Sequence, residues 1–262
     1  SRGETLIWTT TSLHSMQYIG GDFVFGFREL GQKCGAASRR AMVVFDGKAV
    51  WMGRNGFWMY DGYVQPIPSA VADYVFGSIN RTQMSKVYAE VRSAFGEVWF
   101  FYPSGRSEEC NRYVVFNYRD GFMYIGRLAR TAGVDQGIFD SPISAGPAGV
   151  LYQHEVGTSY LDPDGVELVP AAESGPVEIA DGDSVLVGTN VIPDENTLGG
   201  VAITLYSSLT PTDEERTYGP FTPRSITNVR INGRQARVAI RQIEDGWRFG
   251  TLRMEVQPGG RR

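Results

Sequence analysis

The chain has 262 residues, a formal net charge of −4, 42% hydrophobic residues and 21% charged residues. This composition supports a packed core and excludes wholesale disorder. Two cysteines are too few for a disulfide scaffold, no apolar run reaches the ~20 residues of a membrane helix, and the negative charge excludes a nucleic-acid binder held by bulk charge.

Short segments rich in β-branched and aromatic residues begin close to the N-terminus. Asp46, Asp61 and Asp120 are each followed by glycine, a pair that suits tight hairpin turns. Hairpin therefore follows hairpin, and the first part of the chain is predicted to be an antiparallel meander. The predicted strands lie at residues 6–11, 42–45, 49–52, 56–60, 97–102 and 112–118.

One inserted helix is predicted between residues 69 and 89. Gly77 and Asn80 interrupt the helical pattern, so two short helices are an alternative. The apolar residues that predict it recur at helical spacing: Val71, Tyr74, Val75, Ile79 and Val87.

A glycine followed by an apolar, aromatic strand recurs at Gly56, Gly96 and Gly149. An interval of roughly 40–50 residues is typical of β-propeller blades, although any hairpin-rich protein places glycine before strands. Residues 1–170 hold about three such units, whereas a closed ring needs at least ~4. We therefore expect either an N-terminally incomplete propeller or an open arrangement.

The composition changes near residue 170, where aromatic residues become rare. Alternating strands follow, and Asn232-Gly233 predicts a hairpin turn between two of them. The predicted fold class is therefore all-β: a propeller-like meander with one inserted helix in a domain of residues 1–170, and a C-terminal β-sandwich domain of residues 171–262.

Charge is divided unevenly within the second domain. Residues 171–215 contain nine acidic side chains and no Lys or Arg, whereas residues 216–262 contain ten arginines and three acids. The two stretches either neutralise each other within one fold or pair between subunits, and the arginines could also meet phosphate. The candidate contact residues are Arg230, Arg234, Arg237, Arg241, Glu173, Glu178, Asp181 and Asp183.

No catalytic or metal-binding motif is found in the sequence. His14 and His154 lack metal-ligand spacing, and Cys34 and Cys110 are expected to be free thiols. The acidic segments at 162–165 and 181–183 lack the later ligands of a calcium loop and are interpreted as turns. The sequence therefore predicts no catalytic residues, no cofactor, no metal and no enzymatic activity.

Six segments of the chain, residues 6–20, 23–27, 50–62, 113–118, 126–132 and 250–258, have a family resemblance. They resemble tail-complex proteins of tailed bacteriophages, akin to the nozzle or packaged-DNA stabilisation proteins of short-tailed phages. The resemblance covers most of the chain but includes no catalytic motif. Members of that family are longer than this chain, which leaves closure of the ring of blades open.

This resemblance implies a structural virion protein that forms a ring of the head-to-tail channel, and that retains and conducts the genome until DNA ejection. It implies a homo-oligomer, a hexamer, that is assembled in the bacterial cytoplasm, contacts other tail or adaptor proteins, and lets double-stranded DNA pass without sequence recognition. One alternative is a receptor- or carbohydrate-binding tail protein, for which Tyr63, Tyr102 and Tyr160 are the loop aromatic residues. A hydrolase built on a propeller is the other.

Overall fold

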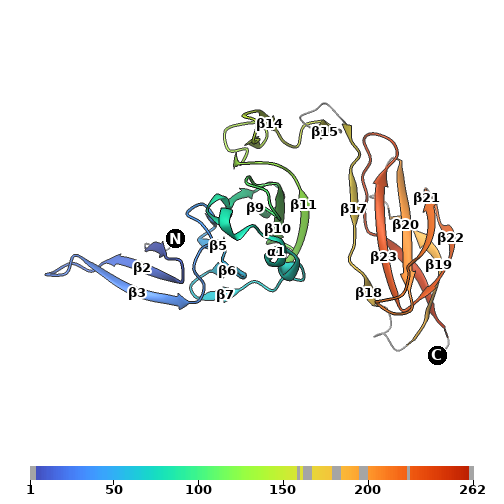
Figure 1. Ribbon diagram of the computed structural model, residues 1–262, viewed down its shortest axis with the longest axis horizontal. Helices are drawn as coiled ribbons and strands as arrows, with labels where there is room; N and C mark the ends of the chain where they lie inside the picture. The colour runs from blue at the N-terminus through green and yellow to red at the C-terminus, as the bar shows by residue number, and fades with distance from the viewer. Residues whose placement is uncertain are drawn as a thin grey trace. The chain divides into compact units, whose positions relative to one another are not determined.

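The computed structural model describes residues 4–157, 160–161, 167–178, 184–194, 200–222 and 225–259. Contacts divide the chain into two units, Ser1–Val156 and Gly157–Arg262. Both are built from antiparallel strands (Figure 1), which confirms the predicted all-β class. The division lies before the predicted boundary at residues 170 and 171, because the short paired strands that follow residue 157 group with the second unit.

The first unit consists of four successive antiparallel meanders, as the propeller-like prediction requires. The outer two sheets have three strands and the middle two have four. They are β1 (Thr5–Trp8), β2 (Ser12–Tyr18) and β3 (Phe25–Gln32); β4 (Met42–Phe45), β5 (Lys48–Met52), β6 (Phe57–Tyr60) and β7 (Val64–Pro66); β8 (Tyr88–Arg92), β9 (Glu97–Tyr102), β10 (Arg112–Asn117) and β11 (Phe122–Arg127); and β12 (Ala132–Val134), β13 (Ile143–Ala145) and β14 (Leu151–Gln153).

Local sequence signals account for the connections in this unit. Asp46 and Gly47 adopt φ values of 46° and 72° in the turn between β4 and β5, as a tight hairpin requires. The predicted helical region forms two short helices, α1 (Ala72–Ser78) and the 3-10 helix η1 (Arg81–Lys86). The chain is extended at Ile79 and Asn80 between them, so the two-helix alternative is confirmed.

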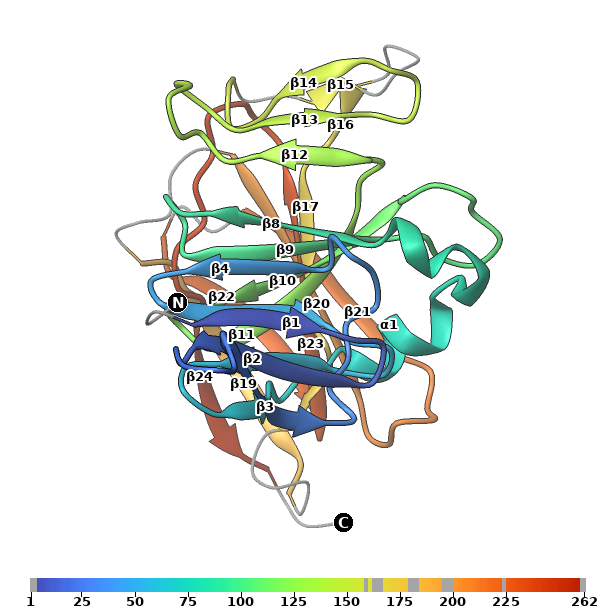
Figure 2. The same ribbon diagram turned by 90° about the vertical axis from the view of Figure 1, so that its left-hand side faces the viewer.

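The four sheets pack face to face, and their first strands β12, β8, β4 and β1 follow one another from top to bottom in Figure 2. Leu13 and Trp51 lie in the layer between the first and second sheets. Val50, Phe57 and Phe100 lie in the layer between the second and third sheets. The second sheet is thus apolar on both faces, whereas the other face of the third sheet includes the charged residues Glu90 and Arg92.

The second unit is a small sandwich, as predicted. Val191, Ile203 and Ile231 are fully or almost fully buried between its two main sheets. One sheet contains β17 (Ala171–Glu173), β18 (Val177–Glu178), β23 (Gln235–Gln242), β20 (Val201–Ser208) and β21 (Arg216–Phe221); the other contains β22 (Thr227–Gly233), β19 (Leu186–Ile192) and β24 (Arg253–Pro258); β15 (Tyr160–Leu161) pairs with β16 (Glu167–Leu168).

The predicted hairpin turn at Asn232-Gly233 is wrong. β22 and β23 belong to different sheets, and the chain crosses from one sheet to the other at Arg234. A Cβ atom on Gly233 would lie 2.9 Å from both Ser207 Cβ and Ser208 O. Glycine is therefore required here by the close approach to β20, and not by a turn.

Within the described residues, no helix is long and apolar enough to span a membrane.

A close backbone approach fixes the connection between the first and second sheets. The amides of Cys34 and Ala36 donate to the carbonyls of Thr11 and Thr9, at 3.1 Å each. Gly35 lies between them, and a Cβ atom on it would be 2.1 Å from the carbonyl carbon of Thr10.

We predict that Gly35→Ala lowers the free energy of unfolding by about 2–3 kcal/mol, because two backbone segments must separate. The control is Gly77→Ala in α1, where a Cβ atom meets nothing within 4 Å and should be stabilising by ~0.5–1 kcal/mol. Chemical denaturation measures both. Equal stability of the two variants would contradict this account.

Candidate ligand-binding site

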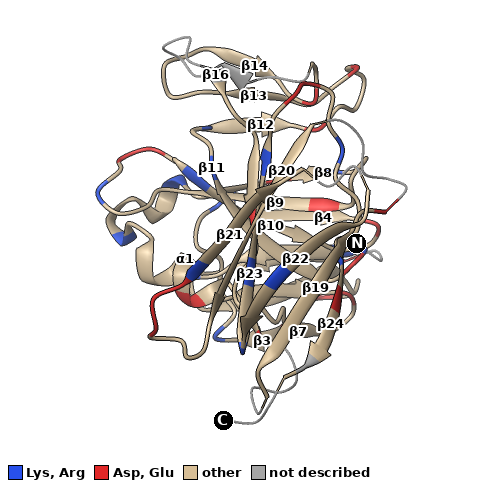
Figure 3. Cartoon of the chain, turned by 90° about the vertical axis from the view of Figure 1, so that its right-hand side faces the viewer, with Lys and Arg blue, Asp and Glu red and all other residues tan. Residues whose placement is uncertain are grey.

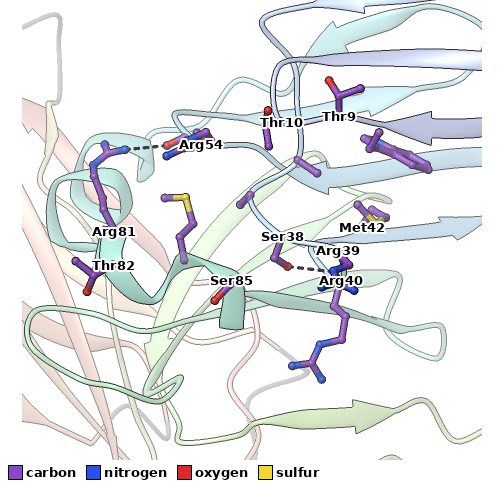
Figure 4. Close-up of a pocket in the computed structure, with 14 residues that line it drawn as sticks. Thr9, Thr10, Ser38, Arg39, Arg40, Met42, Arg54, Arg81, Thr82 and Ser85 are labelled. Atoms are coloured by element: carbon purple, nitrogen blue, oxygen red, sulfur yellow. Dashed lines mark hydrogen bonds between the residues drawn. The ribbon is translucent and has the colours of Figure 1, made fainter.

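A pocket of about 830 Å³ opens in the first unit, where connections of the first three sheets meet. Its lining comes from four segments: the turn after β1, the connection between β3 and β4, the turn between β5 and β6, and η1. Since the lining residues extend from Trp8 to Ser85, 77 positions apart in sequence (85 − 8), the stacking of the sheets is what brings them together (Figure 4).

Four arginines and no Asp or Glu are among the residues that line this pocket. Figure 4 shows Arg54 and Arg81 at one side and Arg39 and Arg40 at the other. All four side chains are exposed, and none makes an ion pair with any residue that the structure describes. The pocket therefore presents uncompensated positive charge to solvent.

Hydrogen bonds hold the two ends of the pocket in place. Arg81 Nη1 donates to Arg54 O at 3.4 Å and to Asn55 Oδ1 at 3.2 Å. Ser38 Oγ accepts from the backbone amide of Arg40 at 3.0 Å and donates to the carbonyl of Val87. The arginines are thus mounted on backbone that the neighbouring sheets restrain, which reduces the entropy lost when a ligand binds.

One wall of the pocket is aromatic and the rest is rich in hydroxyl groups. Trp8 is half-buried and packs edge-on against Trp51, with ring centroids 5.8 Å apart. Thr9, Thr10 and Thr82 are among the hydroxyl residues of the lining. Guanidinium groups, hydroxyl groups and an indole together can bind a polar, anionic molecule with flat apolar faces.

A second polar cluster lies between the third and fourth sheets. Glu90 and Arg92 on β8 are buried, and Glu90 Oε1 accepts from Arg92 Nε at 3.0 Å and from Arg92 Nη2 at 2.6 Å. Burial raises the pKa of Glu90 although Arg92 opposes the shift. A Cβ atom on Gly133 would lie 1.7 Å from Glu90 Oε2, so the fourth sheet covers this carboxylate closely. With its side chain 3% exposed, Glu90 is closed to substrates in this conformation.

His154 belongs to the same polar cluster between the third and fourth sheets. Arg130 is 2% exposed, lies over the Tyr152 ring at 3.7 Å and donates from Nε to His154 Nε2 at 3.1 Å. Burial, with added repulsion from Arg92 and Arg130, lowers the pKa of His154 to about 4. This imidazole is therefore neutral at pH 7 and accepts the bond.

Among the sequence-predicted contact residues, Arg237 has acidic partners. It contacts Glu173 on β17, donates from Nε to Glu215 Oε1 at 3.1 Å, and lies over the Tyr206 ring at 4.1 Å. Arg241 follows Arg237 by four positions on β23, and alternate residues of a strand share a face, so both arginines lie on the same face as predicted. Arg241 makes no ion pair with the described residues. The partners of Arg237 both come from the acidic stretch of the same unit.

The remaining predicted residues do not form one stripe. Arg230 lies on β22 in the other sheet, so the sandwich core separates it from Arg237. Figure 3 shows a basic position, in blue, on β22. Arg234 lies at the crossing between the sheets. Glu178 accepts from Gln235 Nε2 at 3.0 Å. Asp181 and Asp183, like the acidic segment at 162–165, lie outside the described residues.

The remaining sequence expectations concern the two cysteines, the loop tyrosines and metal sites. Cys34 and Cys110 are buried free thiols, as expected, and burial raises the pKa of Cys110 to about 12. Tyr63 is 63% exposed, but Tyr102 is fully buried at the end of β9 and is unavailable for a ligand; the side chain of Tyr160 lies outside the description. In the described part of the chain, no three His, Cys, Asp or Glu residues group as a metal site.

We predict that stability falls as the pH is lowered from 6.5 to 4, and that His154→Gln reduces this fall. The unfolded chain protonates this imidazole near pH 6.5, whereas the folded chain does so only near pH 4, so the unfolded state binds more protons in this window. The raised pKa of Glu90 acts in the opposite direction, but it is present in both proteins. Urea denaturation across this range tests the difference; parallel curves for the two proteins would contradict the prediction.

We also predict that Arg237→Glu lowers the free energy of unfolding by about 1–2 kcal/mol, because the new carboxylate faces Glu173 and Glu215. Arg241→Glu, on the same strand face, is the matched control and should change stability by less than ~0.5 kcal/mol. Chemical denaturation measures both variants. Equal losses of unfolding free energy would contradict the prediction, because the contacts of Arg237 with Glu173 and Glu215 would then not explain the loss.

No protein-family model and no curated protein matches this chain. Solved structures with some similarity include two of an exo-β-1,3-galactanase from Phanerochaete chrysosporium. The structure with galactose has 10% identity and a TM-score of 0.21, over 98% of this chain and 68% of that chain. The structure with β-1,3-galactotriose has 9% identity and a TM-score of 0.27, over 96% and 81%. A further structure, described as a glycoside hydrolase, has 11% identity and a TM-score of 0.23, over 92% and 80%.

These matches correct one expectation. The prediction that the protein is not an enzyme is not retained, because the similar structures are glycoside hydrolases. Their TM-scores are too low to assign a function to this chain. The function is therefore argued from the residues of the pocket alone.

Proposed function

We propose that this protein binds carbohydrate, and that the arginine pocket takes a glycan that carries negatively charged groups. The single observation that carries the proposal is the lining itself, where four exposed guanidinium groups without ion pairs surround an aromatic wall and several hydroxyl groups.

Each part of the lining matches a part of such a glycan. Guanidinium groups bind carboxylate, sulfate or phosphate through paired N–H donors. Serine and threonine hydroxyl groups exchange hydrogen bonds with sugar hydroxyl groups. The Trp8 ring offers an apolar surface to the C–H face of a sugar ring. The proposal concerns binding at this pocket, since its lining contains no carboxylate pair of the kind that glycosidases use.

A glycan explains the pocket better than duplex DNA does. Binding of a duplex depends on many phosphate contacts along a groove or surface, whereas these four arginines lie around one pocket of about 830 Å³. That volume is in the range of small-molecule sites, enough for a few sugar units.

The resemblance to phage tail proteins supplies a context for this activity. We propose a receptor-binding role on a virion tail, where surface glycans of the host would be the ligand. A nozzle ring that conducts DNA stays a prediction, and so does its copy number.

Binding to dextran sulfate and to neutral dextran of the same length tests the proposal, because the two polymers differ only in their charged groups. We expect the intact chain to bind the sulfated polymer, and Arg81→Ala and Arg39→Ala each to weaken binding about 10-fold. The control is Arg106→Ala, an exposed arginine outside the pocket lining, which should change little.

Each other outcome has a defined meaning. Equal binding of both polymers, lost in the pocket variants, would keep carbohydrate binding and overturn the requirement for charge. A 20-base-pair duplex that binds as tightly as dextran sulfate would overturn the glycan assignment in favour of DNA. No binding, or binding unaffected by both pocket variants, would overturn the proposal as a whole.

A further inference from the structure

Among the described residues of the first unit, none packs on the second face of either terminal sheet, and both of these faces are apolar. In the first sheet, the face that contains Leu13 packs on the second sheet. Residues directly opposite each other on paired strands share a face, so Tyr18, Phe25 and Phe27 lie on the other face. They are 73%, 49% and 68% exposed.

The fourth sheet repeats this arrangement at the other end. Gly133 and Ser144 lie against Glu90 of the third sheet. The opposite face is formed by Ala132, Val134, Ile143, Ala145, Leu151 and Gln153, and includes no charged residue. Val134 is 51% and Leu151 is 72% exposed.

The hairpin of β2 and β3 enlarges the first of these faces. It projects beyond the second sheet (Figure 1), and Phe23 at its end is 77% exposed. Between residues 18 and 27 the only charged residue is Asp22. Large exposed apolar patches of this kind mark interaction surfaces.

We infer that the face of the first sheet that bears Phe27 packs on the face of the fourth sheet that bears Leu151 in a second copy of this chain. Inside the unit, apolar faces already pack on one another between the first and second sheets and between the second and third sheets, so the contact between copies continues a type of interface that the fold uses twice. Because the two faces differ, the association is head to tail.

Area and charge agree with this occupant. Four partly exposed aromatic rings on the hairpin offer on the order of 500 Å², more than half of the ~800 Å² per partner of a standard interface. The face of the fourth sheet has no acidic residue, so Asp22 at the hairpin end would meet no like-charge repulsion in the contact between copies. An anionic lipid surface fits less well, because the only charge in the apolar segment is negative.

Sedimentation velocity on the intact chain over a concentration series tests the inference. We expect the wild type to associate, and Phe27→Lys and Leu151→Lys each to raise the dissociation constant by ~30-fold or more. Phe95→Lys is the control, since Phe95 is 47% exposed in the turn between β8 and β9, away from both faces. Near-ultraviolet circular dichroism checks folding, and Phe27→Gln and Leu151→Gln replace any variant that fails it.

Mixing the two variants separates head-to-tail association from pairing of like faces. Each variant keeps one intact face, so an equimolar mixture should form a heterodimer although each variant alone is monomeric. A wild type that stays monomeric at about 100 μM, the highest concentration of the series, would overturn the inference. Another part of the chain or another protein would then have to cover these faces. Association that survives in either variant, or a mixture that stays monomeric, would also overturn it. None of these outcomes bears on glycan binding by the pocket.

Discussion

Face-to-face packing of antiparallel sheets is the constraint on which the first unit depends. A sheet of three or four short strands cannot bury enough apolar surface alone. Here the second sheet is apolar on both faces and packs on the first and third sheets, whereas the third sheet meets the fourth through the polar cluster of Glu90 and Arg92. This explains why the strands of the middle sheets are rich in aromatic and β-branched residues without a regular apolar–polar alternation.

The same packing builds the candidate site. Connections of the first three sheets meet at one place beside the stack. Trp8, Arg39, Arg54 and Arg81 therefore line one pocket although they are far apart in the chain. Arginines without ion pairs repel one another, and this cost persists only where the backbone that carries them is held by other contacts. The hydrogen bonds of Ser38 and Arg81 and the close approach at Gly35 supply such contacts.

Features with a local cause could be predicted from the sequence. Asp46-Gly47 encodes its hairpin turn, and the extended backbone at Asn80 divides the predicted helix. The same type of signal misled at Asn232-Gly233, since a dipeptide does not specify which sheet the next strand joins. Tyr102 was expected on a loop, but it continues the inward alternation of Val98 and Phe100 along β9, a pattern that the sequence does contain.

The pocket could not be predicted, because its arginines share no motif and meet only through the stacking order of the sheets. The adjacent pair Arg39-Arg40 was the one local signal, and an exposed surface explains such a pair equally well. The acidic and arginine-rich halves of the second unit predict contacts between arginines and acids, and this prediction is met at one arginine and not at another. Strand register places Arg237 near Glu173, whereas the crossing of the chain at Arg234 places Arg230 on the other sheet.

Amide hydrogen exchange of the intact chain, with and without dextran sulfate, tests the central claim most directly. That claim is that stacked sheets bring four distant segments together to bind one anionic glycan. The account predicts simultaneous protection of residues 8–10, 36–42, 54 and 81–85, with the sandwich unit unchanged. Protection confined to the arginine-rich strands of residues 216–253, or protection of only one of the four segments, would contradict it.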